Sequence, residues 1–582
     1  MPFPIKRSLF LSIPLLFSGL ATASAQEGAE SPNPQQTLYF GGEILTMDGD
    51  QPSYAEALVE RDGKIVFVGS MEEALAKYES SAQLRDLKGN VLLPGFLDGH
   101  GHMYHTGFMA QVAELLPPPD GPGANFDSLV ESAKSWMATE KGQFIMNELG
   151  WVIGNGFDDS QLEESSYPTA EVLDRISTEY PVLFIHQSGH LAVVNTKALE
   201  LIGYDKNSED PKGGLIRRYE DGSPNGVLEE AAYFNPILPL MTTPSAELQA
   251  RSVQQGQEQY AKNGYTTAQD GRSTSDITSA LAVAARTESL FIDVVAYPDI
   301  IWNRDAIQPE FYRDDRSYSG RYRIGGVKLT LDGSPQGKTA WLTHPYHVPP
   351  AGAPDDYIGY PIMSDEDATK YMKDAFENRW QLQSHTNGDA AIDQFLLALS
   401  AAQVEFGYPD HRTMLIHGQT LRNDQIPDLV RLEVFPSLYP MHTFYWGDWH
   451  VESVLGHPRA DYISPTRDVV DAGLMITSHH DAPVTFPNSM RVLDATVNRV
   501  TRSGVILGRD QRLTPYEGLK TLTDWAAHQY FEEATKGTLT EGKLADFVIL
   551  SENPLSVAPL EIKDIVVLET IKEGKTVFLL PP

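Results

Sequence analysis

The sequence of 582 residues predicts an α/β fold, namely a TIM (β/α)8 barrel with an inserted subdomain and a small β-sandwich domain built from both chain ends. Three observations predict it. Strand-like runs alternate with helical stretches through the middle of the chain, which is typical of parallel βα units. Both chain ends carry short strands bounded by turn residues. The interval between the first two strand-like runs is too long for one crossover, which indicates an insertion.

The N-terminal segment predicts an exported protein. Lys6 and Arg7 precede an apolar run over residues 8–20, and Ala23-Ser24-Ala25 follows. This layout is typical of a cleaved secretory signal over residues 1–25, followed by a polar linker over 26–36. We expect a periplasmic or secreted protein of bacterial type, with an uncleaved anchor as the alternative. Since no other apolar run approaches about twenty residues, no stable membrane span is expected in the mature form.

The β-sandwich is predicted from short strands at the two ends of the chain. Turn pairs such as Asp48-Gly49 and Asp62-Gly63 separate the first of them, which is typical of hairpins. We expect residues 37–90 to form its N-terminal part and residues 528–582 its C-terminal part. The strands expected there are 37–46, 57–60 and 64–69, then 545–550, 564–568 and 575–579.

The barrel is predicted over residues 91–527, with an insert at about 126–240 that covers its mouth. Eight strand-like runs support it, and each precedes a helical stretch or a long loop. The eight expected strands are Val91–Leu97, Thr266–Gln269, Ile292–Tyr297, Arg323–Thr330, Trp380–Ser384, Thr413–Ile416, Val434–Leu438 and Leu474–Ser478.

Composition excludes several classes of function. A formal net charge of -34, spread along the chain, argues against a nucleic-acid partner, because phosphate backbones bind basic surfaces. The chain has no cysteine, so thiolate ligands, cysteine nucleophiles and disulfides are excluded. A metal site must therefore use His, Asp, Glu or a modified Lys. The expected partner is a small-molecule substrate, and a homodimer is left open.

Candidate metal ligands follow the predicted barrel strands. His100 and His102 are two residues apart, so both can point to the same face of an extended chain. Because barrel enzymes place their chemistry at the carboxyl ends of the strands, these side chains should meet at one rim. Imidazole and carboxylate suit zinc and similar divalent ions in an open, catalytic site. One ion, or two that share a hydroxide, would serve a hydrolase. The other candidates are Lys328, His385, His417 and the run His479-His480-Asp481.

With these motifs the chain resembles the amidohydrolase superfamily, and within it the YtcJ-like branch that includes N-substituted formamide deformylase. The similarity covers nearly all of the mature chain. The matching segments are 62–69, 94–102, 326–334, 385–389, 415–419, 478–484 and 537–546.

The resemblance implies a role for each candidate ligand. It makes His100 and His102 ligands of a buried metal, for which zinc is the expected ion, and His385 and His417 ligands of a second. A carboxylated Lys328 would bridge the two ions. Asp481 would bind the first metal and shuttle the proton, which makes it the expected catalytic residue.

Each of these roles has a plain structural alternative. Lys328 could point to solvent or pair with Asp332. Asp481 could be an ordinary helix N-cap. His385 and His417 could be satisfied core histidines.

Three further side chains are candidates for contact with substrate. His190 lies in a segment that resembles one that closes over the pocket in the family. His442 and Trp446 belong to an aromatic run after the seventh strand, which could line a pocket or pack in the core. The roles of His105, His479 and His480 are left open.

The leading hypothesis is hydrolysis of the carbon-nitrogen bond of an N-acyl or N-formyl compound by metal-activated hydroxide. A deaminase is the nearest rival, but Thr-Asn-Gly-Asp after His385 lacks the glutamate that such chemistry needs. An esterase, lactonase or isomerase on the same scaffold is another alternative. A non-catalytic exported metal-binding protein is the alternative from a different class.

Overall fold

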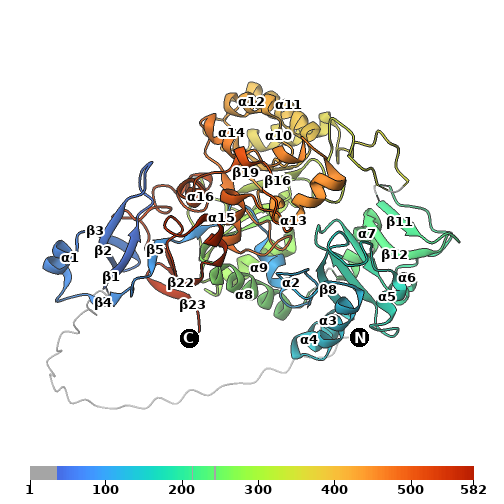
Figure 1. Ribbon diagram of the computed structural model, residues 1–582, viewed down its shortest axis with the longest axis horizontal. Coiled ribbons are helices and arrows are strands. Elements are labelled where there is room, and N and C mark those ends of the chain that lie inside the picture. Colours follow the sequence, from blue (N-terminus) through green and yellow to red (C-terminus); the bar gives the residue numbers. More distant parts are fainter. Residues whose placement is uncertain (1–35, 213, 242–243, 351, 582) are drawn as a thin grey trace, which may run out of the picture.

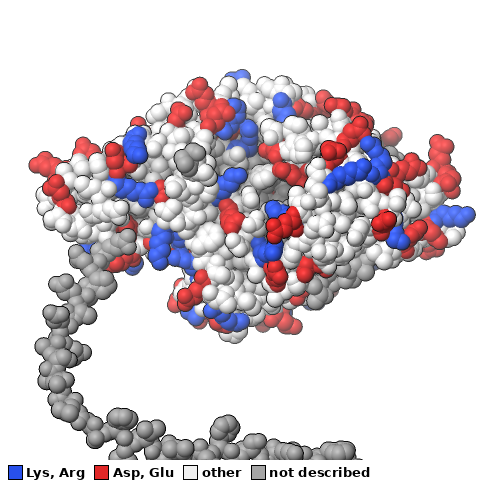
Figure 2. Space-filling model, turned by 90° about the horizontal axis from the view of Figure 1, so that it is seen from below, with Lys and Arg blue, Asp and Glu red and all other residues white. Residues whose placement is uncertain are grey.

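The computed structural model describes residues 36–581, except 213, 242–243 and 351 (Figure 1). The predicted signal segment and nearly all of the predicted linker lie outside the described residues. None of the helices described has the length and apolar character needed to cross a bilayer. Acidic side chains are spread over the face seen in Figure 2, interleaved with lysines and arginines, so the charge there is dispersed.

The two ends of the chain form one sheet, at one side of the molecule in Figure 1. Its path runs β23-β22-β21-β5-β1-β2-β3, and β4 pairs with β1. The packing of this sheet as a sandwich stays a prediction. The strands are β1 (Gln36–Leu45), β2 (Tyr54–Arg61), β3 (Lys64–Gly69), β4 (Gln83–Asp86), β5 (Val91–Pro94), β21 (Phe547–Leu550), β22 (Val567–Lys572) and β23 (Lys575–Leu579).

The middle of the chain holds two all-parallel sheets, with strand orders β15-β14-β13-β6 and β16-β17-β18-β19-β20. Each of the eight predicted strands has a counterpart here, but the fourth, Arg323–Thr330, is divided between β15 and β16, which belong to different sheets. The strands are β6 (Phe96–Leu97), β13 (Tyr265–Ser273), β14 (Asp293–Pro298), β15 (Tyr322–Ile324), β16 (Gly326–Thr330), β17 (Gln381–Thr386), β18 (Met414–His417), β19 (Phe435–Leu438) and β20 (Thr477–Ser478).

Helices follow the central strands, as parallel connections require. Their polar N-caps fix where several of them begin. Ser245, for example, accepts a hydrogen bond from the backbone N–H of Leu248 at the start of α8. The main helices are α2 (Met103–Met109), α8 (Ala246–Lys262), α9 (Ser275–Arg286), α10 (Asp365–Glu377), α11 (Asp389–Phe406), α12 (Ile426–Arg431), α13 (His442–Trp449), α14 (Thr466–Asp471), α15 (Ser489–Asn498), α16 (Pro515–Lys520) and α17 (Asp524–Gln529).

The first predicted barrel strand is divided between two sheets, which corrects the expectation for Val91–Leu97. Residues 91–94 form β5 and pair with β1 and β21, whereas only residues 96–97 pair with β13. Gly95 separates the two parts and lies against β13, where a Cβ atom would meet Thr266 Cγ2 at 2.4 Å. The close approach lets the chain change sheets within one residue.

The predicted insert has its own sheet, of order β11-β12-β10-β9-β8-β7, and lies on the opposite side from the end sheet (Figure 1). The sheet begins at residue 113, earlier than the predicted start at 126. Its elements are β7 (Ala113–Glu114), α3 (Phe126–Met137), α4 (Glu140–Leu149), β8 (Val152–Phe157), α5 (Ala170–Asp174), β9 (Val182–His186), β10 (Leu191–Val194), α6 (Thr196–Ile202), β11 (Gly214–Arg218), β12 (Pro224–Glu230) and α7 (Ala231–Met241).

The loops after the first and last central strands meet. The N–H of Asp481 donates to the carbonyl of His100 at 3.1 Å, and the N–H of His102 donates to that of Ala482 at 2.8 Å. Both loops therefore lie at the same edge as the ends of β16, β17 and β18. Closure of the two sheets into a barrel stays a prediction.

Candidate metal centre

The six predicted ligands come together at the carboxyl ends of five strands. Lys328 lies in β16, His385 in β17 and His417 at the end of β18, while the others lie in the loops after β6 and β20. Contacts between their polar atoms link all six, as given below. The predicted convergence of these residues is therefore what the geometry shows.

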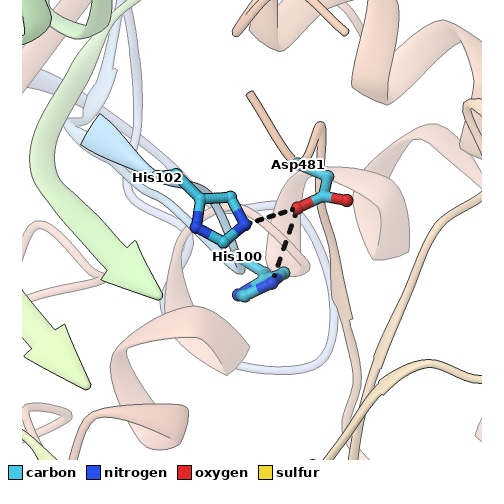
Figure 3. A group of neighbouring side chains, drawn as sticks. All are labelled: His100, His102 and Asp481. Carbon is cyan, nitrogen blue, oxygen red and sulfur yellow. Dashed lines mark ion pairs between the residues drawn. The ribbon is translucent and has the colours of Figure 1, made fainter. Parts of the chain in front are cut away.

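One group consists of His100, His102 and Asp481 (Figure 3). Asp481 Oδ1 lies 3.2 Å from His102 Nε2 and 3.5 Å from His100 Nε2. His100 and Asp481 are buried, and His102 is partly exposed. Ligand atoms about 2.0–2.2 Å from a zinc ion in a tetrahedral arrangement would be separated by distances of this size.

The hydrogen bonds of the two histidines fix which ring nitrogens carry protons. His102 Nδ1 contacts the carbonyl oxygen of Gly271, which can only accept. His100 Nδ1 lies 2.5 Å from Gln269 Oε1, and the amide nitrogen of Gln269 donates to Tyr530. Both Nδ1 atoms therefore donate, and in the neutral rings both Nε2 atoms keep a lone pair.

With both rings neutral, three electron-pair acceptors face one another, and Lys328 Nζ lies 3.0 Å from one of them, His100 Nε2. Asp481 Oδ1 is buried and has no hydrogen-bond partner among the described residues. A buried acceptor of this kind is costly unless it meets a donor or a cation. The donor set, two imidazoles and a carboxylate, fits a divalent ion such as zinc.

The second group consists of His385 and His417. His385 Nε2 lies 3.2 Å from both the carbonyl oxygen of Gly333 and the side-chain nitrogen of Asn387, and in the tautomer that donates to Gly333 its Nδ1 keeps a lone pair. This Nδ1 lies 3.0 Å from His417 Nε2. Burial and, for His385, the nearby ammonium of Lys328 hold the pKa of both rings well below the ordinary value, so both are neutral as metal ligands must be.

Lys328 connects the two groups. Its Nζ lies 3.0 Å from His100 Nε2, and the residue is only 2% exposed. Burial lowers the pKa of Lys328 to about 7. Neither structural alternative holds, because the side chain does not reach solvent and Asp332 is bonded elsewhere, to the N–H groups of Asn387 and Gly388.

A sequence profile of the amidohydrolase family matches residues 83–578. The chain belongs to the amidohydrolase family. The profile includes every residue of both proposed ligand groups, the central strands, and the strands β4, β5, β21 and β22 of the end sheet.

Similar proteins span nearly the whole of this amidohydrolase. YtcJ of Bacillus subtilis, which is named as an amidohydrolase, is 26% identical over 555 residues, or 93% of this chain and 99% of YtcJ. N-substituted formamide deformylase of Arthrobacter pascens is 24% identical over 554 residues, or 92% of this chain and 97% of that protein. An uncharacterized metal-dependent hydrolase of Pyrococcus horikoshii has the same fold, with a TM-score of 0.71, 23% identity, and coverage of 90% of this chain and 99% of that one.

The loop that carries His100 and His102, two proposed ligands of this amidohydrolase, is held in place by buried side chains. Asp98 accepts the N–H of His100 at 3.0 Å, and His480 Nε2 faces its carboxylate at 3.2 Å. Gly101 is required because a Cβ atom there would meet Tyr260 Oη at 2.3 Å. His480 Nδ1 accepts the N–H of Ala482, and its Nε2 faces Asp98 without forming a hydrogen bond, so the ring points away from the proposed ligand groups.

Of the predicted substrate contacts, His190 lies nearest the ligands. It follows β9 in the insert, and its ring centroid is 6.4 Å from that of His385. Its Nδ1 lies 2.9 Å from Glu230 Oε1, so Nδ1 donates and Nε2 is left for another partner. Contact with a substrate oxygen stays a prediction.

His442 and Trp446 are buried in a stack of rings behind the ligands. The ring of Tyr439 lies 4.7 Å from those of both His479 and His442, and the ring of His442 lies 4.6 Å from Trp446. Trp446 Nε1 donates to Asp158 Oδ2 at 2.7 Å, which joins α13 to the insert. Both side chains therefore pack in the interior, as one of the two interpretations from the sequence expected. Their contact with substrate stays a prediction.

A third cluster, Asp158, Asp159 and His186, lies in the insert. Burial opposes charge on His186, but hydrogen bonds to the two aspartates raise its pKa to about 9. Its Nε2 lies 3.1 Å from Asp159 Oδ1, while Nδ1 is held by Ser188. Because the proton on Nε2 occupies the space between the side chains, the cluster is satisfied as an ion pair without a metal.

Sequence reasoning did not assign the residues that orient the ligands. His479 was noted in the run His479-His480-Asp481 with its role left open, whereas nothing in the local sequence marks Gln269, which lies within β13. His105 is partly buried beside His102, with ring centroids 6.3 Å apart. The only signal for Gln269 and His479 was position, since Gln269 belongs to a predicted central strand and His479 directly follows another.

Proposed function

We propose that this amidohydrolase cleaves the carbon-nitrogen bond of a small N-acyl or N-formyl compound. The observation that carries the proposal is the meeting of three ligand atoms, with Asp481 Oδ1 3.5 Å from His100 Nε2 and 3.2 Å from His102 Nε2. This geometry supports a divalent ion, for which zinc is the best match to the donor set. His385 and His417 would hold a second ion.

Bound ions would lower the pKa of a water molecule and polarise the substrate carbonyl. The residues of the chain supply the remaining functions. Asp481 lies within 3.9 Å of His417 Nε2 as well as beside the first group, so its carboxylate can reach both ion positions. It can take a proton from the attacking water and return it to the departing amine nitrogen. Carboxylation would convert Lys328 into an anion that bridges the two positions.

The surroundings of His385 favour amide hydrolysis over ring deamination. The acidic residue that follows this histidine is Asp389, and its carboxylate binds the N–H of Thr343 at 2.9 Å and faces Arg422. It is therefore committed to neighbouring loops. The name of the Arthrobacter pascens relative, N-substituted formamide deformylase, also supports a carbon-nitrogen bond as the target.

The replacement Asp481→Asn tests the proposal. With zinc-loaded protein and a panel of N-formyl amines, N-acyl amino acids, lactones and aminopyrimidines, we expect the wild type to release amine from the amides. The Asn variant should lose at least about 100-fold in kcat, because general acid-base groups contribute on this scale. It should retain most of its metal, since the histidines remain.

Asp494→Asn in α15 is the matched control, since this carboxylate bonds Arg491 and Asn498. It should leave turnover unchanged. Turnover of lactones or aminopyrimidines in place of amides would reject the proposed reaction, and full activity in the Asp481→Asn variant would reject the proton role of Asp481.

Export is proposed from the sequence alone. The basic pair, the apolar run and Ala23-Ser24-Ala25 support removal of residues 1–25. Mass analysis of the protein made by its bacterial host checks this, and a mature chain that still begins at Met1 would contradict it.

A further inference from the structure

His479 contacts His417, one of the proposed ligands. It follows β20 and is fully buried. Its Nε2 lies 3.1 Å from His417 Nδ1, and its Nδ1 lies 3.0 Å from Ser437 Oγ. His417, His479 and Ser437 thus form a chain of hydrogen bonds that ends at the ligand atom, His417 Nε2.

The hydrogen bonds that link these three side chains can all point in either of two directions. In one, Ser437 donates to His479, His479 donates to His417, and the proton on His417 Nε2 points at His385 Nδ1, 3.0 Å away. That proton occupies the lone pair a metal would need. In the other, His417 Nδ1 donates to His479 Nε2, His479 Nδ1 donates to Ser437, and His417 Nε2 is left unprotonated.

Ser437 can accommodate the second direction. Its hydroxyl lies 3.2 Å from the carbonyl oxygen of Gly99, which can only accept. The hydroxyl proton can therefore be given to Gly99 while the oxygen accepts from His479. Gly99 adjoins His100, so the chain of hydrogen bonds runs from one ligand group to the loop that carries the other.

We propose that His479 is a positioning residue that selects the tautomer of His417 with Nε2 free for the second metal ion. The inference rests on the proposed metal-dependent function and adds a residue to it. Partners of this kind orient ligating histidines and raise their affinity for metal, typically by about 10 to 100-fold.

Two variants of similar polarity separate orientation from packing. In His479→Gln the side-chain amide reaches the position of Nε2, so it can still accept the proton of His417 Nδ1. In His479→Asn the shorter amide reaches only the position of Nδ1, so it keeps the contact with Ser437 and loses the one with His417. His457→Gln, at an exposed histidine, is the control.

The measurement is titration of the metal-free protein with Co²⁺, followed by its visible absorption and by isothermal calorimetry. We expect the Asn variant to bind the second ion at least about 10-fold more weakly, with an altered Co²⁺ spectrum, and the Gln variant to stay within about threefold of wild type. Thermal unfolding of the metal-free variants establishes that each is folded.

Equal affinities in the Asn variant and the wild type would overturn the inference. So would equal losses in the Asn and Gln variants, because His479 would then act only by packing. Failure of the proposed function looks different, since wild-type protein itself would then bind no second ion or cleave no amide.

Discussion

At the scale of single residues, the proposed histidine ligands are oriented by hydrogen bonds at the ring nitrogens that point away from the cluster. Gly271, Gln269 and Gly333 each engage the ring nitrogen of a histidine that does not face the cluster. The candidate ligands could be proposed from sequence, because His and Asp at strand ends suit a divalent ion. Their orienting partners were not, since a glutamine or a backbone carbonyl carries no such signature.

Lys328 gives a prediction on pH. An amine must be neutral to react with carbon dioxide, and burial lowers the pKa of Lys328 to about 7 in the metal-free protein. Carboxylation should therefore accelerate as pH rises through about 7 and then level off. Protein stripped in carbon dioxide-free buffer, returned to bicarbonate and zinc, and assayed over time gives the rate.

The control for this prediction is Lys328→Met, which should not respond to bicarbonate at any pH. A rate that rises only above about pH 10, the ordinary range of lysine, would show that burial does not activate this amine.

At the scale of elements, the insert is tied to the central strands by a few polar contacts. Gln187, directly after β9, donates to the carbonyl of Val484 at 3.1 Å, just beyond Asp481. Trp446 in α13 donates to Asp158, directly after β8. An insert was predictable from the length of the interval, but these contacts were not, because each joins residues about 290 or more positions apart.

Trp446→Phe tests this connection. The change keeps an aromatic ring and removes the donor to a buried carboxylate, which should lower the free energy of unfolding by about 1–3 kcal/mol. Urea unfolding of metal-free protein measures it. Trp302→Phe, at a side chain that is 67% exposed, should cost much less. Equal losses in the two variants would show that the hydrogen bond to Asp158 contributes nothing specific.

At the scale of the whole molecule, the end sheet is joined to the central strands by buried charges. Lys572 in β22 lies 2.6 Å from Asp293 in β14, and Lys536 lies 2.7 Å from the same carboxylate. Burial alone would raise the pKa of Asp293, but the two ammonium groups outweigh it and hold the pKa far below the ordinary value. The carboxylate therefore stabilises the folded state when ionised.

Lys572→Met should destabilise the protein by about 3–5 kcal/mol near pH 7, because it leaves a buried carboxylate with less compensation. The sign of the pH dependence follows from the depressed pKa. The contribution of Asp293 is complete above about pH 4, where the unfolded carboxyl is ionised, and is lost as pH falls through the folded value.

The difference in stability between wild type and Lys572→Met should therefore shrink in acid. Urea unfolding from pH 3 to pH 8 checks it, with Lys563→Met, at an exposed pair with Asp564, as control. A difference that stays constant down to pH 3 would contradict the linkage to Asp293.

The sequence by itself predicted most of the central strands, an insertion and six candidate ligands that the fold brings together, because these depend on local periodicity and on residue type at strand ends. Only the tertiary structure decided that β5 belongs to the end sheet and that His479 contacts His417. It also placed Gln269 beside His100, 169 positions away in the chain. Contacts over such separations depend on how the elements pack, and a single sequence carries no local pattern that encodes them.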